Sequence, residues 1–199
     1  MKKPTNLFFA PLLWLIALGT VDVASAQTSE ELTTQCQQGN AEACFNLGVR
    51  YRKGEGVTQD SFKAVALYRK ACDGQAAGAC FNLAMMYDTG TGVKPDAVKA
   101  VELWTRACDG QIAEACFNLG VAYDNGTGLT QDAVKAVALY QRACDAQHAK
   151  GCFNLGVSYR YGEGVRQSDE RARKFYGKAC DLNSERGCQD YARLKTPKK

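Results

Sequence analysis

The stretch Ala43-Cys44-Phe45-Asn46-Leu47-Gly48 decides the fold, because the chain repeats it at a constant interval. It returns as Ala79-Cys80-Phe81-Asn82-Leu83-Ala84, then as Ala115-Cys116-Phe117-Asn118-Leu119-Gly120, and finally as Gly151-Cys152-Phe153-Asn154-Leu155-Gly156. Successive copies lie 36 residues apart each time. A fixed period between about 20 and 50 residues predicts a solenoid, in which each repeat buries its apolar face against its neighbours.

Each repeat begins with a helical pattern, which we call helix A. In the first repeat one stripe recurs at the spacing of an α-helix and consists of Cys44, Leu47, Gly48 and Tyr51. The pattern predicts a helix over residues 41–53. We expect Gly54-Glu55-Gly56 to end it, because glycine adopts the backbone angles that a helix terminus needs.

A second helix, helix B, is expected to follow Asp60 and to end near Cys72. Asp60 stands at the N-cap, where its carboxylate accepts hydrogen bonds from free backbone amides. Its equivalents in the later repeats are Asp96, Asp132 and Ser168, all of which cap well. The apolar stripe of this helix is formed by Ala64, Leu67, Tyr68 and Ala71.

Small and aromatic residues occupy fixed positions in every repeat, which predicts close helix contacts with large side chains filling the gaps. The small positions are Ala64, Ala100, Ala136 and Ala172 on helix B, and Gly48, Ala84, Gly120 and Gly156 on helix A. The aromatic positions are Tyr51, Tyr87, Tyr123 and Tyr159 on helix A, and Tyr68, Trp104, Tyr140 and Tyr176 on helix B. We expect this aromatic ladder to be core.

The first 26 residues read as a secretory signal peptide. Lys2 and Lys3 precede a mostly apolar run over residues 7–18, and Ala24-Ser25-Ala26 is a small-residue cleavage site. Removing the segment leaves 23 basic and 20 acidic residues, a net charge of +3. That charge is too small to indicate nucleic-acid binding. Because no second apolar run follows, no membrane span is expected after cleavage.

Ten cysteines remain in the mature chain, and an even number in an exported protein predicts disulfides. They fall into five pairs with seven residues between partners. We predict that each pair closes on itself, because this uses all ten cysteines: Cys36–Cys44, Cys72–Cys80, Cys108–Cys116, Cys144–Cys152 and Cys180–Cys188. The competing scheme joins cysteines within a repeat, such as Cys44 with Cys72, and leaves Cys36 and Cys188 over. No metal site is expected, because the chain has no C-x-x-C and His148 is its only histidine.

The domain organisation follows from the period. Residues 41–76, 77–112, 113–148 and 149–184 are the four repeats, numbered 1 to 4 below. Residues 27–40 carry Cys36 at the helix B position and are interpreted as an N-terminal capping half-repeat. Residues 185–199 are interpreted as a C-terminal capping helix with a basic tail.

The pattern x-C-F-N-L-G-x-x-Y-x-x-G-x-G-V-x-x-D-x-x-K-A, followed by Y-x-x-A-C-D, resembles the Sel1-like repeat over residues 41–183. The paired cysteines make it similar to the disulfide-rich Hcp-type branch of that family. The resemblance implies an all-α fold of αα-hairpins stacked in a right-handed superhelix with a concave groove. It also implies a scaffold or adaptor. Exported Hcp-type members have been described as penicillin-binding proteins with slow β-lactamase activity, which is the alternative function.

The related tetratricopeptide fold implies that helix A lines the groove and that the residue before the conserved leucine points into it. One carboxamide per repeat holds that position: Asn46, Asn82, Asn118 and Asn154. Val49, Met85, Val121 and Val157 would add an apolar floor, with Arg52 and Arg160 as charges at the two ends and Asp88 and Asp124 between them. A carboxamide suits a peptide backbone or a terminal carboxylate. The alternative is that these asparagines bond the neighbouring helix and belong to the scaffold.

Sequence signatures of catalysis are missing. Ser61 is followed by Phe-Lys-Ala and Ser158 by Tyr-Arg-Tyr, so neither starts a Ser-x-x-Lys motif. No cofactor is expected. We therefore expect a periplasmic or secreted protein that binds a protein or peptide, with a peptidoglycan fragment or a β-lactam as further candidate ligands.

Overall fold

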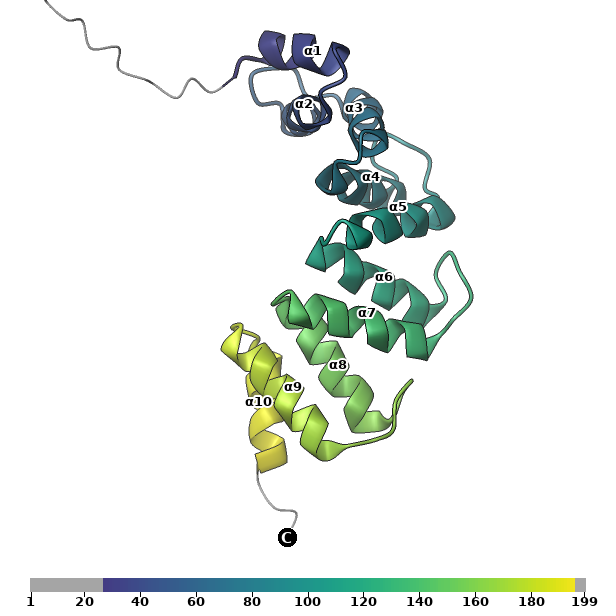
Figure 1. The fold of residues 1–199 in the computed structure, drawn as a ribbon, viewed down its shortest axis with the longest axis vertical. Coiled ribbons are helices and arrows are strands. Elements are labelled where there is room, and N and C mark those ends of the chain that lie inside the picture. The colour runs from purple at the N-terminus through teal and green to yellow at the C-terminus, as the bar shows by residue number, and fades with distance from the viewer. Residues whose placement is uncertain (1–26, 196–199) are drawn as a thin grey trace, which may run out of the picture.

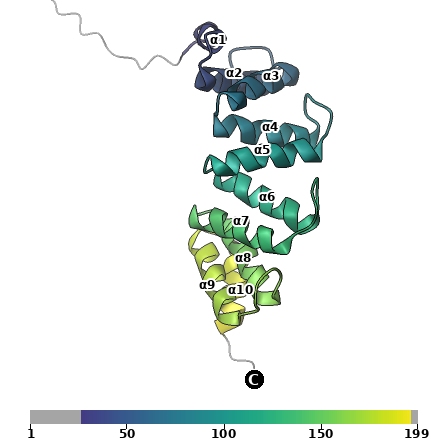
Figure 2. The same cartoon turned by 45° about the vertical axis from the view of Figure 1, so that its right-hand side comes forward.

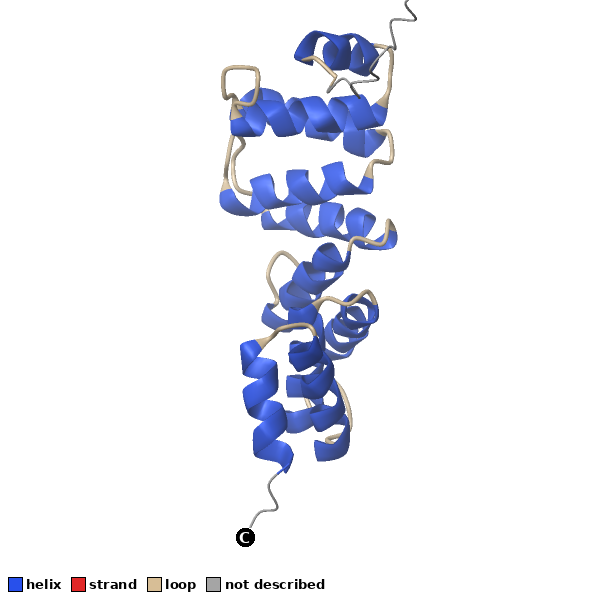
Figure 3. Ribbon diagram, turned by 90° about the vertical axis from the view of Figure 1, so that its left-hand side faces the viewer, coloured by secondary structure: helices blue, strands red, loops and turns tan. Residues whose placement is uncertain are grey.

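The computed structural model describes residues 27–195, which are helical and contain no strand (Figure 3). The expected signal peptide and residues 196–199 of the basic tail lie outside these described residues. The helices are α1 (Ser29–Gln37), α2 (Ala41–Lys53), α3 (Ser61–Asp73), α4 (Ala77–Thr89), α5 (Ala97–Asp109), α6 (Ala113–Asn125), α7 (Ala133–Asp145), α8 (Ala149–Tyr161), α9 (Asp169–Asp181) and α10 (Glu185–Lys195).

The helices stack in chain order into one curved array, with α1 at one end and α10 at the other (Figure 1). Helices α2, α4, α6 and α8 are the A helices of the four repeats, and α3, α5, α7 and α9 are the B helices. Each helix packs on the helix before it and the helix after it. The predicted all-α solenoid is therefore confirmed. Figure 2 shows the longer loops of the α4–α5 and α6–α7 hairpins on the same edge of the stack.

The predicted start and stop signals operate as expected. Asp60 accepts a hydrogen bond from the backbone N–H of Lys63 at 3.0 Å, and the equivalent residues of the other repeats cap α5, α7 and α9 in the same way. Helix α2 ends at Gly54, whose φ of 77° lies in the left-handed region. The A and B helices of each repeat are thus delimited by local chemistry.

The second glycine of each Gly-x-Gly turn connects one repeat to the previous one. Gly128 has a φ of +74°, and a Cβ at this position would lie 2.5 Å from the backbone oxygen of Ala97, at the start of helix B in the preceding repeat. Gly92 meets the backbone of Ser61 in the same manner. The sequence predicted only a turn here, whereas the structure uses the missing side chain for a contact between repeats.

The five disulfides join each cysteine pair to itself, which confirms the predicted pairing, so the competing within-repeat scheme is wrong. Cys72 is the penultimate residue of α3 and Cys80 is the fourth residue of α4, so their bridge spans the short turn between two repeats. Gln75 in this turn has a φ of 66°, and residues at the equivalent positions of the later turns are also left-handed without being glycine. The disulfide therefore closes a backbone corner that non-glycine residues adopt reluctantly.

A basic side chain near the end of each B helix reaches back to the preceding repeat. Arg142 Nη2 donates to the carbonyl oxygen of Cys108 at 2.9 Å and pairs with Asp109 at 3.3 Å. Arg106 makes the same contacts to Cys72 and Asp73, and Lys70 donates to the carbonyl of Cys36. These cations satisfy carbonyls at a helix C-terminus, where the helix dipole also favours positive charge.

The helix B aromatics are buried as predicted: Tyr68, Trp104, Tyr140 and Tyr176. They pack so closely on helix A that a Cβ on Gly120 would lie 2.8 Å from the ring of Tyr140. The helix A tyrosines differ, because Tyr87 is buried but Tyr51, Tyr123 and Tyr159 are only half-buried. A cation from the following B helix lies over each of these four rings.

His148, which sequence reasoning considered only as a metal ligand, is the N-cap of α8. Its Nδ1 accepts from the backbone N–H of Gly151 at 3.1 Å, and its ring lies 4.9 Å from that of Phe117 in the preceding A helix. Burial lowers the pKa of His148; Glu114 opposes that shift and Lys150 adds to it. The neutral imidazole is therefore the form that the fold requires.

We predict that Gly128→Ala is much more damaging than Gly126→Ala. Both glycines are left-handed, which costs a non-glycine residue about 1–2 kcal/mol. A Cβ on Gly128 would overlap the Ala97 oxygen at 2.5 Å, whereas at Gly126 the nearest backbone oxygen, that of Leu129, lies at an ordinary 3.6 Å; the overlap should cost about 1–3 kcal/mol more. Denaturant unfolding of the oxidised variants measures the difference. Equal losses would contradict the proposed contact between repeats.

We also predict that acid weakens the joint between repeats 3 and 4. The pKa of His148 is lower in the folded chain than in the unfolded chain, so the unfolded state binds more protons as the pH falls. The stabilisation by the cap is complete above the unfolded pKa of about 6.5 and is lost as the pH falls through the folded pKa. The free energy of unfolding should fall by about 1 kcal/mol, the usual contribution of an N-cap. His148→Asn keeps a capping group that does not titrate, so its unfolding free energy should vary less between pH 7 and pH 5; an unchanged pH dependence would refute the assignment.

Candidate functional site

We call one set of A-helix positions the helix-A face: the asparagine of each A helix and the residues three and six positions after it. Its members are Asn46, Val49 and Arg52 on α2, Asn82, Met85 and Asp88 on α4, Asn118, Val121 and Asp124 on α6, and Asn154, Val157 and Arg160 on α8. All four asparagines are half-buried, so their carboxamides are neither core nor fully solvated. The face is built by one repeated helix position, which explains its regularity.

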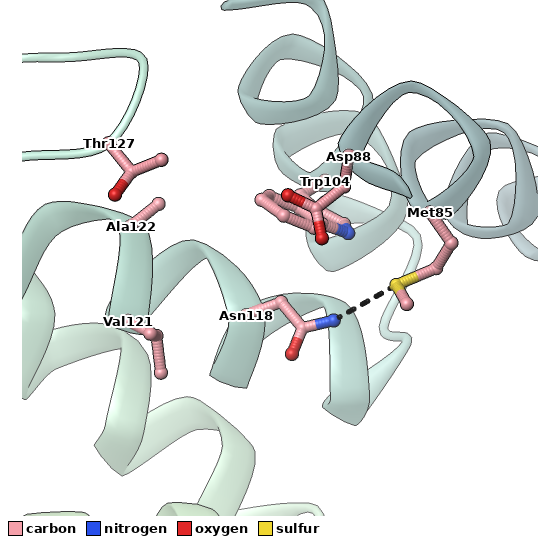
Figure 4. Close-up of a pocket in the computed structure, with 7 residues that line it drawn as sticks. All are labelled: Met85, Asp88, Trp104, Asn118, Val121, Ala122 and Thr127. Carbon is pink, nitrogen blue, oxygen red and sulfur yellow. Dashed lines mark hydrogen bonds between the residues drawn. The ribbon is translucent and has the colours of Figure 1, made fainter. Parts of the chain in front are cut away.

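Two hollows lie on the helix-A face. The first hollow, of about 540 Å³, is lined by Arg52, Gln59, Ser61, Phe81, Asn82, Met85, Met86, Thr89, Thr91 and Glu114. The second hollow, of about 230 Å³, is lined by Met85, Asp88, Trp104, Asn118, Val121, Ala122 and Thr127 (Figure 4). Met85 borders both, so the two hollows adjoin along α4. The structure thus brings together Arg52, Asn82 and Asn118 of the predicted set, while Asn46 and Asn154 line neither hollow.

The asparagines also contact the preceding repeat. The Asn154 carboxamide lies beside the Tyr140 hydroxyl and that of Asn82 beside the Tyr68 hydroxyl, although the Tyr68 hydroxyl has no partner at hydrogen-bond distance. Burial raises the pKa of both tyrosines, and these carboxamides oppose the rise. Asn118 differs, because its Nδ2 donates to the Met85 sulfur at 3.6 Å, which is a weak contact (Figure 4). Two of the four carboxamides therefore lie beside a buried tyrosine of the preceding repeat as well as at the surface, and the predicted choice between scaffold and surface stays open for them.

The predicted charges at the ends of the face have different surroundings. Arg160 pairs with Asp169, and this hydrogen bond raises the pKa of the guanidinium. Arg52 is exposed and lines the first hollow beside Tyr68. Asp124 accepts a hydrogen bond from the Tyr140 hydroxyl at 3.1 Å. Asp88 is exposed, and among the described residues its carboxylate has no hydrogen bond or ion pair.

The A helices of the two central repeats carry only acidic charge. Helix α4 contains Asp88 as its one charged residue, and α6 contains Glu114 and Asp124. Helices α2 and α8 each carry a net positive charge. The middle of the helix-A face is therefore acidic within a chain whose formal net charge is +4. No group of three histidine, cysteine, aspartate or glutamate side chains within residues 27–195 could hold a metal ion.

Sequence reasoning missed Trp104 as a surface component, because its position in the aromatic ladder indicated core. The structure buries its ring and also makes it a wall of the second hollow. A signal was available, since this is the one helix B position in the series where tryptophan replaces tyrosine. Thr127, in the Gly-x-Gly turn, could not be placed at the hollow without the tertiary structure.

Comparison with known proteins gives one family. The model of the family described as Sel1 repeat matches residues 41–75, 77–111, 113–148 and 149–184. No curated protein matches the chain. None of the helices within residues 27–195 has the combination of length and apolar character that a bilayer span needs.

Several solved structures are similar. The protective antigen c5321 of uropathogenic Escherichia coli, described as displaying an SLR fold, is 30% identical with a TM-score of 0.78 over 81% of this chain, which spans only 35% of that antigen. Cysteine-rich protein B of Helicobacter pylori is 31% identical with a TM-score of 0.53, over 68% of this chain and 98% of its own length. A Sel1 repeat protein from Oxalobacter formigenes shares the fold at 23% identity and a TM-score of 0.74, over 84% of this chain and 75% of that one.

We predict that Asn154→Ala lowers stability more than Asn118→Ala. Asn154→Ala removes a polar group beside the buried hydroxyl of Tyr140, which should cost about 0.5–1.5 kcal/mol, whereas Asn118→Ala removes only a weak contact to sulfur. Urea unfolding of the two variants beside the parent chain measures the difference. If Asn118→Ala is as destabilising as Asn154→Ala, Asn118 is also a scaffold residue.

Proposed function

Because this chain belongs to the Sel1 repeat family, we propose that its helix-A face binds an extended peptide segment of a protein partner. Sel1 repeat proteins are typically protein-interaction scaffolds, and a rigid solenoid offers a long surface for such contacts. The observation that carries the proposal is the pair of adjoining hollows on α4, each with a half-buried carboxamide in its wall. A carboxamide has both an N–H donor and a carbonyl acceptor, so it can pair with the C=O and N–H groups that alternate along a peptide backbone.

The composition of the hollows supports an extended ligand. Met85, Val121 and Phe81 supply apolar contact, while Asn82 and Asn118 supply polar contact at intervals of one repeat. Alternating apolar and polar contacts suit a strand-like peptide, whose side chains project to opposite sides. A peptidoglycan fragment, which also carries peptide bonds, remains a second ligand of the same proposed surface.

We propose that the protein acts outside the cytoplasm, in the periplasm or after release from the cell. Five disulfides are typical of an extracytoplasmic protein, because thiols stay reduced in the cytosol. The similarity to the cysteine-rich protein of Helicobacter pylori is in keeping with such a location. In this proposal residues 1–26 form the export signal.

The proposal predicts that Asn118→Ala weakens peptide binding without unfolding the protein. Peptides are first selected from a random decapeptide library by the oxidised parent protein, and the affinity of one selected peptide is then measured by calorimetry. We expect about a tenfold loss for Asn118→Ala, as removal of one hydrogen bond at a binding surface allows. Thr105→Ala, on the exposed side of α5, is the matched control and should leave affinity unchanged. Equal affinities for all three proteins would contradict this use of the face.

A penicillin-binding protein with weak β-lactamase activity is the alternative function. The sequence carries no Ser-x-x-Lys motif to support it. Hydrolysis of a chromogenic β-lactam by the oxidised protein, with a reduced sample in parallel, separates the two functions. Turnover that disappears on reduction would place the alternative first.

A further inference from the structure

The second hollow contains a buried donor without an acceptor. Trp104 is 6% exposed, and its indole Nε1–H has no hydrogen-bond partner among the described residues. Figure 4 shows the indole nitrogen at the end of the ring that faces Met85 and Asn118. An unpaired buried N–H is unfavourable, and it is therefore a place where a ligand acceptor gains affinity.

The change from tyrosine to tryptophan creates this donor. In repeats 1 and 3 the equivalent residue is a tyrosine whose hydroxyl, both donor and acceptor, meets an asparagine of the next repeat. The indole only donates, and the Nδ2 of Asn118 is turned to the Met85 sulfur. Tyr68 Oη is the other buried side-chain polar atom in the described chain without a partner at hydrogen-bond distance, but Arg52 and Asn82 lie beside it and it does not line the second hollow.

A carboxylate lies in the same hollow. Asp88 lines it, is exposed, and forms no hydrogen bond or ion pair within the described residues. No lysine or arginine is present on α4 or α6 to neutralise it. The next carboxylate along the face, Asp124, is already hydrogen-bonded to Tyr140. The hollow therefore offers an unpaired anion and an unpaired neutral donor side by side.

We propose that the second hollow binds the free amino terminus of the peptide. This inference rests on the proposed function of the helix-A face and specifies which part of the ligand enters. The α-ammonium group donates to the Asp88 carboxylate, and the carbonyl oxygen of the first residue accepts from Trp104 Nε1. The ammonium group and the carbonyl oxygen belong to the same amino-acid residue, which matches the presence of Asp88 and Trp104 in one hollow. The first side chain then packs on Val121 and Ala122, and a volume of about 230 Å³ suits a small one.

Other peptide groups satisfy only part of the site. A lysine or arginine side chain pairs with Asp88 but leaves the indole N–H unpaired, because these side chains have no acceptor. A terminal carboxylate accepts from Trp104 but is repelled by the like charge of Asp88 in the same hollow. The amino terminus alone combines a cation with an acceptor next to it.

Trp104 allows a direct test, because the only other tryptophan of the chain is Trp14, in the expected leader. The protein is expressed from its full-length sequence, labelled with ¹⁵N and purified oxidised, and the Trp104 indole N–H resonance is assigned with Trp104→Phe. Three amidated peptides serve as probes: Ala-Ala-Ala with a free amino terminus, the same peptide acetylated, and acetylated Ala-Lys-Ala. We expect only the first to shift the indole resonance downfield, with at least tenfold weaker binding of the other two.

Asp88→Asn should weaken binding of the free tripeptide at least tenfold, whereas Glu102→Gln, which removes an exposed carboxylate of α5 outside both hollows, should change it less than threefold. Equal binding of the acetylated peptides would overturn the amino-terminal inference but leave the proposed peptide-binding face standing. Binding that is unaffected by Asp88→Asn would have the same meaning. If no peptide perturbs the indole or the asparagine side-chain resonances, both the inference and the proposed function fail.

Discussion

One disulfide bridges every turn from a B helix to the following A helix, and the rest of the structure depends on this joint. A solenoid repeat contacts only its neighbours, so its weakest point is the junction between repeats. Here the turn Gly74-Gln75-Ala76 places a non-glycine residue in the left-handed region, and the Cys72–Cys80 bridge closes over it. In the chain-entropy model a closed loop of this kind contributes roughly 2–3 kcal/mol.

Two non-covalent contacts act at the same joints. Arg142 holds a carbonyl and a carboxylate at the end of the previous B helix, and Gly128 lies against the start of that helix. The arginine therefore holds the C-terminal end of the previous B helix, the glycine turn packs on its N-terminal end, and the disulfide closes the turn between the repeats. The spacing and orientation of successive A helices are consequently determined before any ligand is present.

This frame lets single substitutions change the chemistry of the helix-A face without changing its shape. The position six residues after the asparagine is Arg52, Asp88, Asp124 or Arg160 in the four repeats, and all four occur on helices of equal length. At the aromatic position of helix B, Trp104 replaces the tyrosine of the other repeats. Its buried indole N–H can only donate, and it has no partner among the described residues. Specificity in such a protein resides in the departures from the repeat, whereas stability resides in the repeat itself.

The sequence by itself determined the fold and the bounds of the first helix A, and it reduced the disulfide pairing to two schemes, because each depends on local chemistry repeated at a constant period. Asp60 is the N-cap of α3 and Gly54 is the C-cap of α2, and both roles follow from the residue type and its position in the repeat. The cysteine spacing allows few pairings once the period is known. The period also located the asparagines on a common helix position, but it left their role open between surface and scaffold.

Only the tertiary structure decided how those residues are used. It showed that Asn154 lies beside the Tyr140 hydroxyl while Asn118 contacts the Met85 sulfur, that Asp169 pairs with Arg160, and that Asp88 has no hydrogen-bond or ion-pair partner within residues 27–195. It also placed Trp104 in a hollow between two A helices. These facts depend on contacts between different helices, from 9 residues apart in the sequence for Arg160 and Asp169 to 33 for Asn118 and Met85. Such contacts follow from the angle at which successive hairpins pack, and a one-dimensional pattern of residue types does not contain that angle.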